Sequence, residues 1–257
     1  MSKAPSNTSG TTEAGGVTPS AGQRYLAGSH QLLERLLDEV WDDISAAAEL
    51  LTQCLLAGGS LHTFGSGHGH MLAEEAYYRA GGLVAVRPIL FDGLMLHAGA
   101  RQSTALERLP GLAAALLTEH PIEAGDVLLV ASNSGGNAVT IQMAEAARSC
   151  GASVVAITSL AHAASPLARS VTGPRLHELA DVAIDNGGVP GDAIVSIDGV
   201  ETAVGPTSTV IGAAIVNALI AETVERMARA GIVPAVYQSA NLAGGDAANK
   251  RYQEASG

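Results

Sequence analysis

Apolar residues recur at helical spacing near the start of the chain and predict a long helix. Between residues 25 and 57, leucine, isoleucine, valine and alanine return every three or four positions, and Gly58 and Gly59 then supply a stop. We expect one helix over 25–57, with a break near Gly28 as the alternative. Its apolar stripe packs on the core of the domain or, in part, forms a dimer face. Periodicity alone leaves both interpretations open.

Beyond Gly59 the pattern changes to short apolar runs that alternate with glycine- and serine-rich turns and helical segments. The predicted strands are 60–64, 83–90, 127–131, 153–158 and 181–184, and the predicted helices are 71–80, 106–117, 138–150 and 209–230. Strands that alternate with helices form parallel βαβ units, and helices cover both faces of such a sheet. We therefore predict an α/β fold whose ligand binds outside the carboxyl ends of the strands.

The two ends of the chain differ in composition from this body. Residues 1–22 are rich in Ser, Thr, Gly and Pro. They predict a disordered tail, because so few apolar side chains cannot offset the entropy lost on ordering. Residues 23–257 have the length of a single domain. Within it, segment 239–246 is too polar for the core and is expected as a loop that closes over the ligand or covers a dimer surface.

The formal net charge of −11 restricts the possible partners. Nucleic acids and anionic membranes both select basic surfaces, so we expect neither as a partner. An anionic ligand would instead be held by backbone N–H groups and helix N-termini. No apolar run approaches about 18 uncharged residues, the length that spans a bilayer, and the N-terminus lacks the order of a signal peptide.

Lysine and cysteine usage excludes several enzyme classes. The only lysines are Lys3 and Lys250, near the two ends of the chain. A body without lysine argues against pyridoxal phosphate enzymes, Schiff-base aldolases and P-loop proteins. Cys54 and Cys150 have no CxxC or Cys/His spacing, which is typical of reduced cysteines and predicts a cytoplasmic protein.

Three turns that follow or precede these elements suit an anionic ligand. Turn 65–70 is rich in glycine, which lets the backbone approach an anion. It does not match the dinucleotide-binding motif Gly-x-Gly-x-x-Gly, because His70 stands where that motif has its third glycine. Turn 132–137 gathers hydroxyl and amide donors, and turn 205–209 opens the last apolar helix, where plain helix capping is the structural alternative. The candidate ligands of such an anion are Gly65, Ser66, Gly67, Ser132, Asn133, Ser134, Asn137, Thr207 and Ser208.

From about residue 28 to 250 the sequence resembles the sugar isomerase (SIS) domain family. Segment 132–137 is similar to the family's Ser-x-Ser-Gly-x-Thr phosphate loop, with Asn137 in place of the usual hydroxyl residue. Segment 165–169 is similar to its Ser-x-Leu-Ala motif, and 185–187 falls where such domains leave the last strand. The Phe-Gly-x-Gly-His-x-His and Gly-Pro-Thr-Ser-Thr signatures resemble those of an uncharacterised bacterial subgroup.

This resemblance implies a three-layer αβα sandwich with a five-stranded parallel sheet. It also implies a homodimer or dimer of dimers, with sugar sites at the subunit interface and a 6-phosphate held by the Ser/Thr loops. SIS proteins include aldose–ketose isomerases, an N-acetylmuramic acid 6-phosphate etherase and sugar-phosphate sensors of transcription factors. In the isomerases and the etherase, a carboxylate removes the proton at C2 of the opened sugar.

Three glutamates are candidates for that base. Glu74 and Glu75 follow the first glycine loop, close to where the etherase carries its catalytic glutamate. Glu201 precedes Thr207 by the interval found in the isomerase domain of glucosamine-6-phosphate synthase. Each has a structural alternative, either a carboxylate that stabilises a helix N-terminus or one in a solvated loop.

His68, His70 and His97 are the candidate acids or ring-opening residues, because histidine titrates near neutral pH. The His-x-His pair lacks a third ligand of recognisable spacing, so we predict no metal and no other cofactor. Glu107, close to Arg101 and Arg108, is interpreted as part of an ordinary salt-linked helix start.

Together these features predict a carbon–oxygen lyase, a dehydratase, that acts on an N-acetylamino hexose 6-phosphate. N-acetylglucosamine 6-phosphate is the preferred substrate, and the position of Glu74 and Glu75 is the reason for preferring elimination. An aldose–ketose isomerase is the first alternative. A non-catalytic phosphosugar-binding regulatory module is the alternative of another class, although residues 1–22 are too short and polar for the DNA-binding domain that such sensors usually carry.

Overall fold

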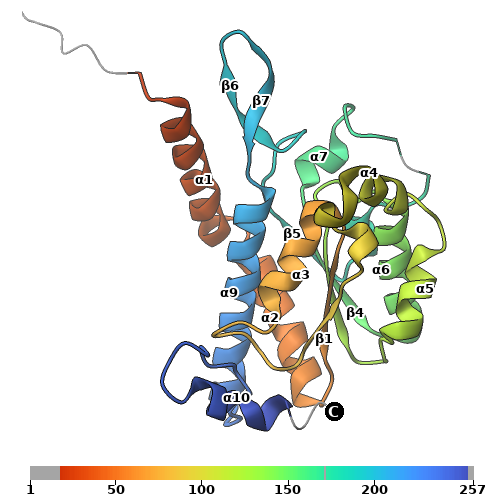
Figure 1. Ribbon diagram of the computed structural model, residues 1–257, viewed down its shortest axis with the longest axis vertical. Helices are drawn as coiled ribbons and strands as arrows, with labels where there is room; N and C mark the ends of the chain where they lie inside the picture. The colour runs from red at the N-terminus through yellow and green to blue at the C-terminus, as the bar shows by residue number, and fades with distance from the viewer. Residues whose placement is uncertain (1–17, 171, 254–257) are drawn as a thin grey trace, which may run out of the picture.

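Five parallel strands form the central sheet of the computed structural model, which describes residues 18–170 and 172–253 (Figure 1). The strands are β1 (Leu61–Gly65), β2 (Val86–Ile89), β3 (Val127–Ala131), β4 (Ser153–Thr158) and β5 (Val182–Asp185). Their order in the sheet is β2-β1-β3-β4-β5. The predicted α/β fold with a five-stranded parallel sheet is confirmed, and each predicted strand overlaps an observed one.

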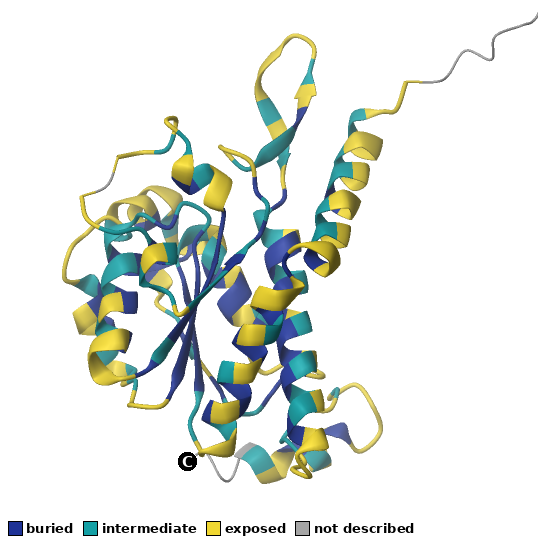
Figure 2. Cartoon of the chain, turned by 180° about the vertical axis from the view of Figure 1, so that it is seen from behind, coloured by how far each residue is buried: buried dark blue, intermediate teal, exposed yellow. Residues whose placement is uncertain are grey.

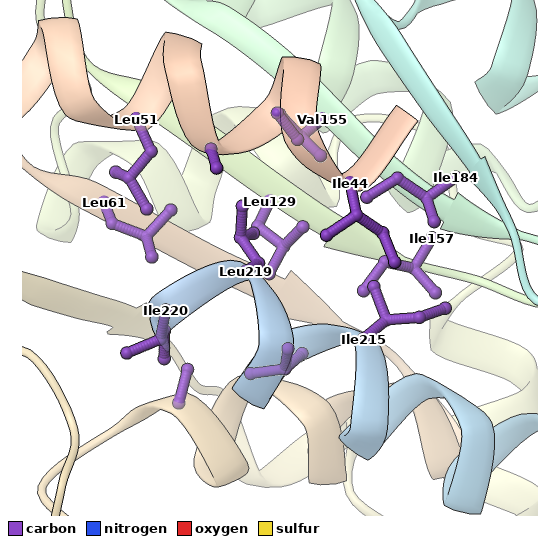
Figure 3. Packing of buried hydrophobic residues seen from close by; sticks show 14 of the residues in the cluster. Ile44, Leu51, Leu61, Leu129, Val155, Ile157, Ile184, Ile215, Leu219 and Ile220 are labelled. Carbon is purple, nitrogen blue, oxygen red and sulfur yellow. The ribbon is translucent and has the colours of Figure 1, made fainter. Parts of the chain in front are cut away.

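Helices cover both faces of this sheet. The helices of the described chain are α1 (Ala21–Asp38), α2 (Trp41–Leu56), α3 (His70–Ala76), α4 (Leu96–Leu106), α5 (Leu112–Glu119), α6 (Ala138–Cys150), α7 (Leu160–Ala164), α8 (Leu176–Leu179), α9 (Ser208–Arg229) and α10 (Gly245–Gln253), with short 3₁₀ turns at Gly67–Gly69 and Asp92–Leu94. Leu129 and Val155 face α2 and α9, as Figure 3 shows, whereas Leu128 and Val154 face α5 and α6. This alternation explains why the strands are continuous apolar runs in the sequence.

The N-terminal helical region consists of two helices, so the prediction of one long helix was wrong. The break lies at Glu39 and Val40 and not near Gly28. The apolar face of α2 packs on the sheet, while α1 leaves the body and buries only Ser29 and Leu36. Helix α1 begins at Ala21 after a Ser20 capping box. The last two residues of the predicted tail are therefore helical, and residues 1–17 lie outside the described residues.

An antiparallel hairpin of β6 (Ala193–Ile197) and β7 (Val200–Pro206) stands outside the main sheet, and it carries Glu201, for which a solvated loop was the structural alternative. It packs on α1: the Arg24 guanidinium donates to the Ser196 carbonyl at 3.0 Å, and the Tyr25 hydroxyl donates to the Pro206 carbonyl at 3.0 Å. We call α1, β6 and β7 the arm. Figures 1 and 2 show it projecting from the body, with much of its surface exposed.

The C-terminal segment lies at the opposite end of the molecule from the arm (Figure 1). Val236 bridges to Leu83, just before β2, and Asn249 exchanges two hydrogen bonds with the backbone of Gln238. The expected loop therefore leads into helix α10. It sits beside the amino ends of the strands and, in this chain, does not cover their carboxyl ends.

Helix α9 is long and apolar enough, by length and composition, to cross a membrane, and within 18–170 and 172–253 no other helix is. In the fold it packs against α2 and α3, and its buried face joins the core through residues such as Ile215 and Leu219 (Figure 3). Its apolar character is therefore explained by its place as a core helix.

Candidate functional site

A cavity of about 430 Å³ opens at the carboxyl ends of β1, β3 and β4. This is the edge where parallel sheets place their ligands, and the volume suits a small molecule such as a phosphorylated sugar. Its described lining residues with polar side chains are Ser66, His68, Ser103, Thr104, Glu107, Ser132, Asn133, Ser134, Asn137, His162, Asn186, Asp192, Ser208 and Thr209. None of the described lining residues is a lysine or an arginine. An anion in this cavity would thus rely on neutral hydrogen-bond donors and helix N-termini.

The glycine loop after β1 is pressed against the end of β3. A Cβ atom on Gly65 would lie 2.3 Å from the carbonyl carbon of Gly69, and one on Gly69 would lie 2.4 Å from the carbonyl oxygen of Ala131. The His70 ring is buried and its Nδ1 atom donates to the Gly67 carbonyl at 2.5 Å. His70 therefore fixes the loop, and Ser66 and Gly67 reach the cavity.

The carboxylate of Glu107 enters the cavity from the end of α4 and accepts a hydrogen bond of 2.9 Å from the Ser66 hydroxyl. We had interpreted Glu107 as an ordinary salt-linked residue. None of the ion pairs in the described part of the chain includes it, and its contact with Ser66 links positions 41 residues apart. No local sequence pattern indicates such a contact, because only the fold brings α4 to the loop after β1.

His162 also lines the cavity and was not predicted as a site residue. Its Nδ1 atom accepts a hydrogen bond of 3.2 Å from the backbone N–H of Gly191. Because that N–H can only donate, the neutral ring carries its proton on Nε2 and offers a donor there. His162 and the exposed His68 are thus the two histidines that the described chain brings to the cavity.

A second carboxylate, that of Asp192, binds the start of α9. Its Oδ1 atom accepts from the N–H groups of Thr207 and Ser208 at 3.2 and 2.9 Å, and its Oδ2 atom accepts from the Ser208 hydroxyl at 2.5 Å. Asp192 has a positive φ of 69°, which is uncommon for a residue with a side chain. The side-chain oxygen thus caps a helix whose own N-cap residue, Thr207, supplies no such bond.

A protein-family model described as SIS domain matches residues 24–159. The chain belongs to the SIS domain family. It is 42% identical over 226 residues to the UPF0309 protein lin2794 of Listeria innocua, which covers 88% of this chain and 92% of the relative. It is 43% identical over 231 residues to the UPF0309 protein GK1441 of Geobacillus kaustophilus, which covers 90% of this chain and 92% of the relative.

Two solved structures share the SIS fold. One is a phosphoheptose isomerase from Francisella tularensis, with 17% identity and a TM-score of 0.52 over 78% of this chain and 94% of that protein. The other is the phosphoheptose isomerase GmhA from Neisseria gonorrhoeae, with 19% identity and a TM-score of 0.50 over 77% of this chain and 94% of that protein. At such identities the likeness concerns the fold alone.

Within the SIS domain, most of the predicted phosphate and sugar ligands line the cavity. These are Ser66, Gly67, Ser132, Asn133, Ser134, Asn137 and Ser208. Gly65 is the last residue of β1 and lies outside the lining. Thr207 is fully buried, and its hydroxyl group has no hydrogen-bond partner among the described residues. Their part in ligand binding stays a prediction.

The predicted catalytic glutamates lie outside the lining of this cavity. Glu74 is half exposed on α3, with one oxygen 3.6 Å from Nε2 of His70. Glu75, also on α3, accepts from the side-chain amide of Asn217 at 2.7 Å and pairs with Arg79. Glu201 is exposed on β7. Within one chain, the carboxylates that reach the cavity are therefore not the predicted ones.

The predicted histidines are divided by the fold. His68 lines the cavity, His70 braces the glycine loop, and His97 is exposed on α4 outside the lining. Among residues 18–170 and 172–253, no group of three His, Cys, Asp or Glu side chains could hold a metal ion. The absence of a metal and of other cofactors stays a prediction.

Proposed function

We propose that the cavity binds the 6-phosphate of an N-acetylamino hexose and that the protein is a dehydratase that removes the proton at C2. The observation that carries this proposal is the Glu107 carboxylate, which shares the cavity with the donor-rich loop 132–137. The loop suits an anion, and the carboxylate suits a proton on a carbon next to a carbonyl group. N-acetylglucosamine 6-phosphate remains our preferred substrate.

The proposed reaction begins with the open-chain sugar. Glu107 takes the proton from C2, and the electron pair moves toward the C1 carbonyl to give an enolate. The pair then returns to form the C2–C3 double bond, and the hydroxyl at C3 leaves as water after it receives a proton. His68 or His162 supplies that proton, because both line the cavity. No electrons are gained or lost overall, so no redox partner is needed.

The placement of Glu107 changes which residue we propose as the base. The preference for elimination had rested on Glu74 and Glu75, which lie outside the cavity of a single chain. An aldose–ketose isomerase therefore remains the alternative reaction, since it uses the same first step and returns the proton to C1.

We also propose that the working protein is a homodimer whose arm reaches the partner, with the sites near the interface. Leu26 and Leu37 on α1 are 67% and 69% exposed, and Val200 on the hairpin is 50% exposed. Apolar side chains gathered on a projecting element are typical of a surface that a partner covers. We place the protein in the cytoplasm.

Proton NMR in deuterated water tests the proposed function. The purified protein is incubated with N-acetylglucosamine 6-phosphate, and the C2 proton and the vinylic region are followed. Loss of the C2 signal together with a new olefinic signal supports the dehydratase. The isomerase is tested in the same way with a hexose 6-phosphate that carries a hydroxyl group at C2, and loss of its C2 signal with a ketose product supports the isomerase. A spectrum that stays unchanged while phosphosugar binding is measurable contradicts both and supports a binding module.

A further inference from the structure

Three carbonyl groups of the loop 132–137 are occupied by partners outside the loop. The carbonyl oxygens of three consecutive residues each accept from a donor outside the loop. That of Asn133 accepts from the Ser159 N–H at 3.2 Å, that of Ser134 from the Arg175 guanidinium at 3.0 Å, and that of Gly135 from the Leu176 N–H at 2.8 Å. These three carbonyl groups are therefore not available to the cavity, and beside its backbone N–H groups the loop offers its side chains.

The orientation of the Asn133 amide follows from a chain of hydrogen bonds that starts at the backbone. The Gly188 N–H donates at 2.9 Å to one end of the Asn186 amide, and an N–H can only donate, so that end is the oxygen. The other end of Asn186 is consequently its NH₂ group, which donates at 3.0 Å to Asn133. Asn133 must therefore receive this bond on its oxygen.

This leaves the NH₂ group of Asn133 for the cavity that the residue lines. None of the described hydrogen bonds uses its Nδ2 atom. Asn186 is only 3% exposed, so neither amide can turn over without leaving a buried polar group unpaired. The backbone of Gly188 thus dictates, through Asn186, that Asn133 presents a donor.

An independent contact orients the second amide of the loop in the same way. The Arg169 guanidinium, which has donors only, donates to Oδ1 of Asn137 at 2.6 Å. Asn137 is the N-cap residue of α6, yet its side chain makes no capping bond to that helix. Its oxygen is used by Arg169, and its NH₂ group remains for the cavity that Asn137 also lines.

We propose that Asn186 and Arg169 are positioning residues that hold the amides of Asn133 and Asn137 as donors, and so make the site specific for a phosphoryl group. Neither residue acts as a charged ligand: Asn186 is neutral, and Arg169 does not line the cavity. This inference rests on the proposed phosphosugar function and deepens it, because it assigns recognition of the anion to fixed amide dipoles. Asn137 then does what a hydroxyl would do in a loop of the Ser-x-Ser-Gly-x-Thr type.

The substitution Asn186→Asp tests the first amide. A carboxylate still accepts from Gly188 but cannot donate, so Asn133 turns over and presents its oxygen to the ligand. We expect binding of inorganic phosphate, measured by NMR titration, to weaken at least about tenfold, because a donor to an anion becomes an acceptor. Asn186→Ala removes the hydrogen bond to the Asn133 amide without reversing the orientation of that amide. We therefore expect a smaller loss of phosphate binding.

The negative charge that Asn186→Asp introduces could repel phosphate by itself, and a double-mutant cycle separates the two effects. The substitution Asn186→Asp is repeated in a chain that carries Asn133→Ala. If Asn186 acts through the Asn133 amide, the additional loss becomes much smaller in that background. If the loss is undiminished there, direct charge repulsion explains it and the inference is wrong.

The exposed Arg169 gives a second test that does not risk the core. Arg169→Glu should weaken phosphate binding in the wild-type background and have little further effect in a chain that carries Asn137→Ala. In protein labelled with ¹⁵N-asparagine, phosphate should shift the side-chain NH₂ signals of Asn133 and Asn137, which the two alanine variants identify. Signals that do not move on saturation overturn the proposal.

These outcomes distinguish this inference from the proposed function. A protein that binds phosphate through both amides but turns over no sugar contradicts the dehydratase and leaves the inference standing. A protein that turns over sugar while Asn186→Asp and Arg169→Glu bind phosphate as the wild type does contradicts the inference alone. A wild-type protein that binds no phosphate contradicts both.

Discussion

The Ser66 hydroxyl donates to the Glu107 carboxylate across 2.9 Å and ties the glycine loop after β1 to the end of α4. This contact places a carboxylate opposite the donor loop that follows β3, within one cavity. It also leaves the second oxygen of Glu107 without a described hydrogen bond, so that oxygen is available to a substrate proton. Ser66 therefore holds Glu107 in the position from which we propose that it acts as the base.

The tight packing within the glycine loop after β1 predicts that Gly65 cannot be replaced by alanine without loss of stability. The added Cβ would meet the backbone of Gly69 at 2.3 Å, and backbone cannot rotate away. We expect Gly65→Ala to lower the free energy of unfolding by about 1–3 kcal/mol in urea titrations and to weaken phosphate binding. Gly22→Ala, where nothing lies within 4 Å, is the control and should stay within about 1 kcal/mol of the wild type. Equal stability of the two variants would contradict the proposed packing.

The parts of the fold that the sequence predicted are those whose signal is local. Strands β3 and β4 match their predicted bounds because both faces of these strands are buried, so nearly every position is apolar. The hairpin was missed because its strands are partly exposed and lie outside the main sheet, although Asp198 and Gly199 between them form the two-residue turn that is typical of a hairpin. The break between α1 and α2 was missed because no proline or glycine marks it.

The same distinction applies to the candidate site. Loop 132–137 carries a dense local pattern of Ser, Asn and Gly, which sequence reasoning could find. Glu107 and His162 carry no such pattern, since each reaches the cavity only through tertiary contacts. A carboxylate can be assigned to a site from sequence only when its neighbours along the chain also belong to that site.

A buried histidine–aspartate hydrogen bond far from the cavity predicts a loss of stability in mild acid. Burial is the main cause that lowers the pKa of His62 below its ordinary 6.5, and its Nε2 atom lies 3.0 Å from the Asp126 carboxylate. Burial opposes the ionisation of Asp126, but hydrogen bonds from the backbone N–H groups of Glu123 and Ser60 and from His62 outweigh it and lower the pKa of Asp126 below 3.8. Asp126 therefore stays charged in mild acid. As pH falls below 6.5, the unfolded chain binds a proton on His62 that the folded chain resists, and stability decreases.

Urea titrations at pH 7.5 and 5.5 check this expectation. The wild type should be less stable at pH 5.5, and His62→Gln, which keeps a side-chain nitrogen near Asp126, should show a smaller difference between the two values. His30→Gln is the matched control, because His30 is 71% exposed. A difference as large in His62→Gln as in the wild type would show that other groups cause the pH dependence.

The exposed leucines of the arm predict a dimer that charge can disrupt. Leu26→Glu and Leu37→Glu place a carboxylate where we propose that a partner packs, so sedimentation velocity should show a smaller species than the wild type. Leu167→Glu is the control, since Leu167 is 85% exposed and lies outside the arm. Arm variants that sediment with the wild type would contradict the proposed interface.

The central claim is that Glu107 removes the C2 proton, and exchange of that proton in deuterated water tests it most directly. Wild type, Glu107→Gln, Glu74→Gln, Glu75→Gln and Glu201→Gln are compared with N-acetylglucosamine 6-phosphate, and Glu119→Gln serves as an exposed-carboxylate control. The glutamine side chain can still accept the hydrogen bond from the Ser66 hydroxyl, but it cannot take the proton from C2. We predict that Glu107→Gln loses at least about a hundredfold in exchange rate while it still binds phosphate, and that Glu119→Gln matches the wild type. Exchange that survives in Glu107→Gln and collapses in Glu74→Gln, Glu75→Gln or Glu201→Gln would contradict the claim.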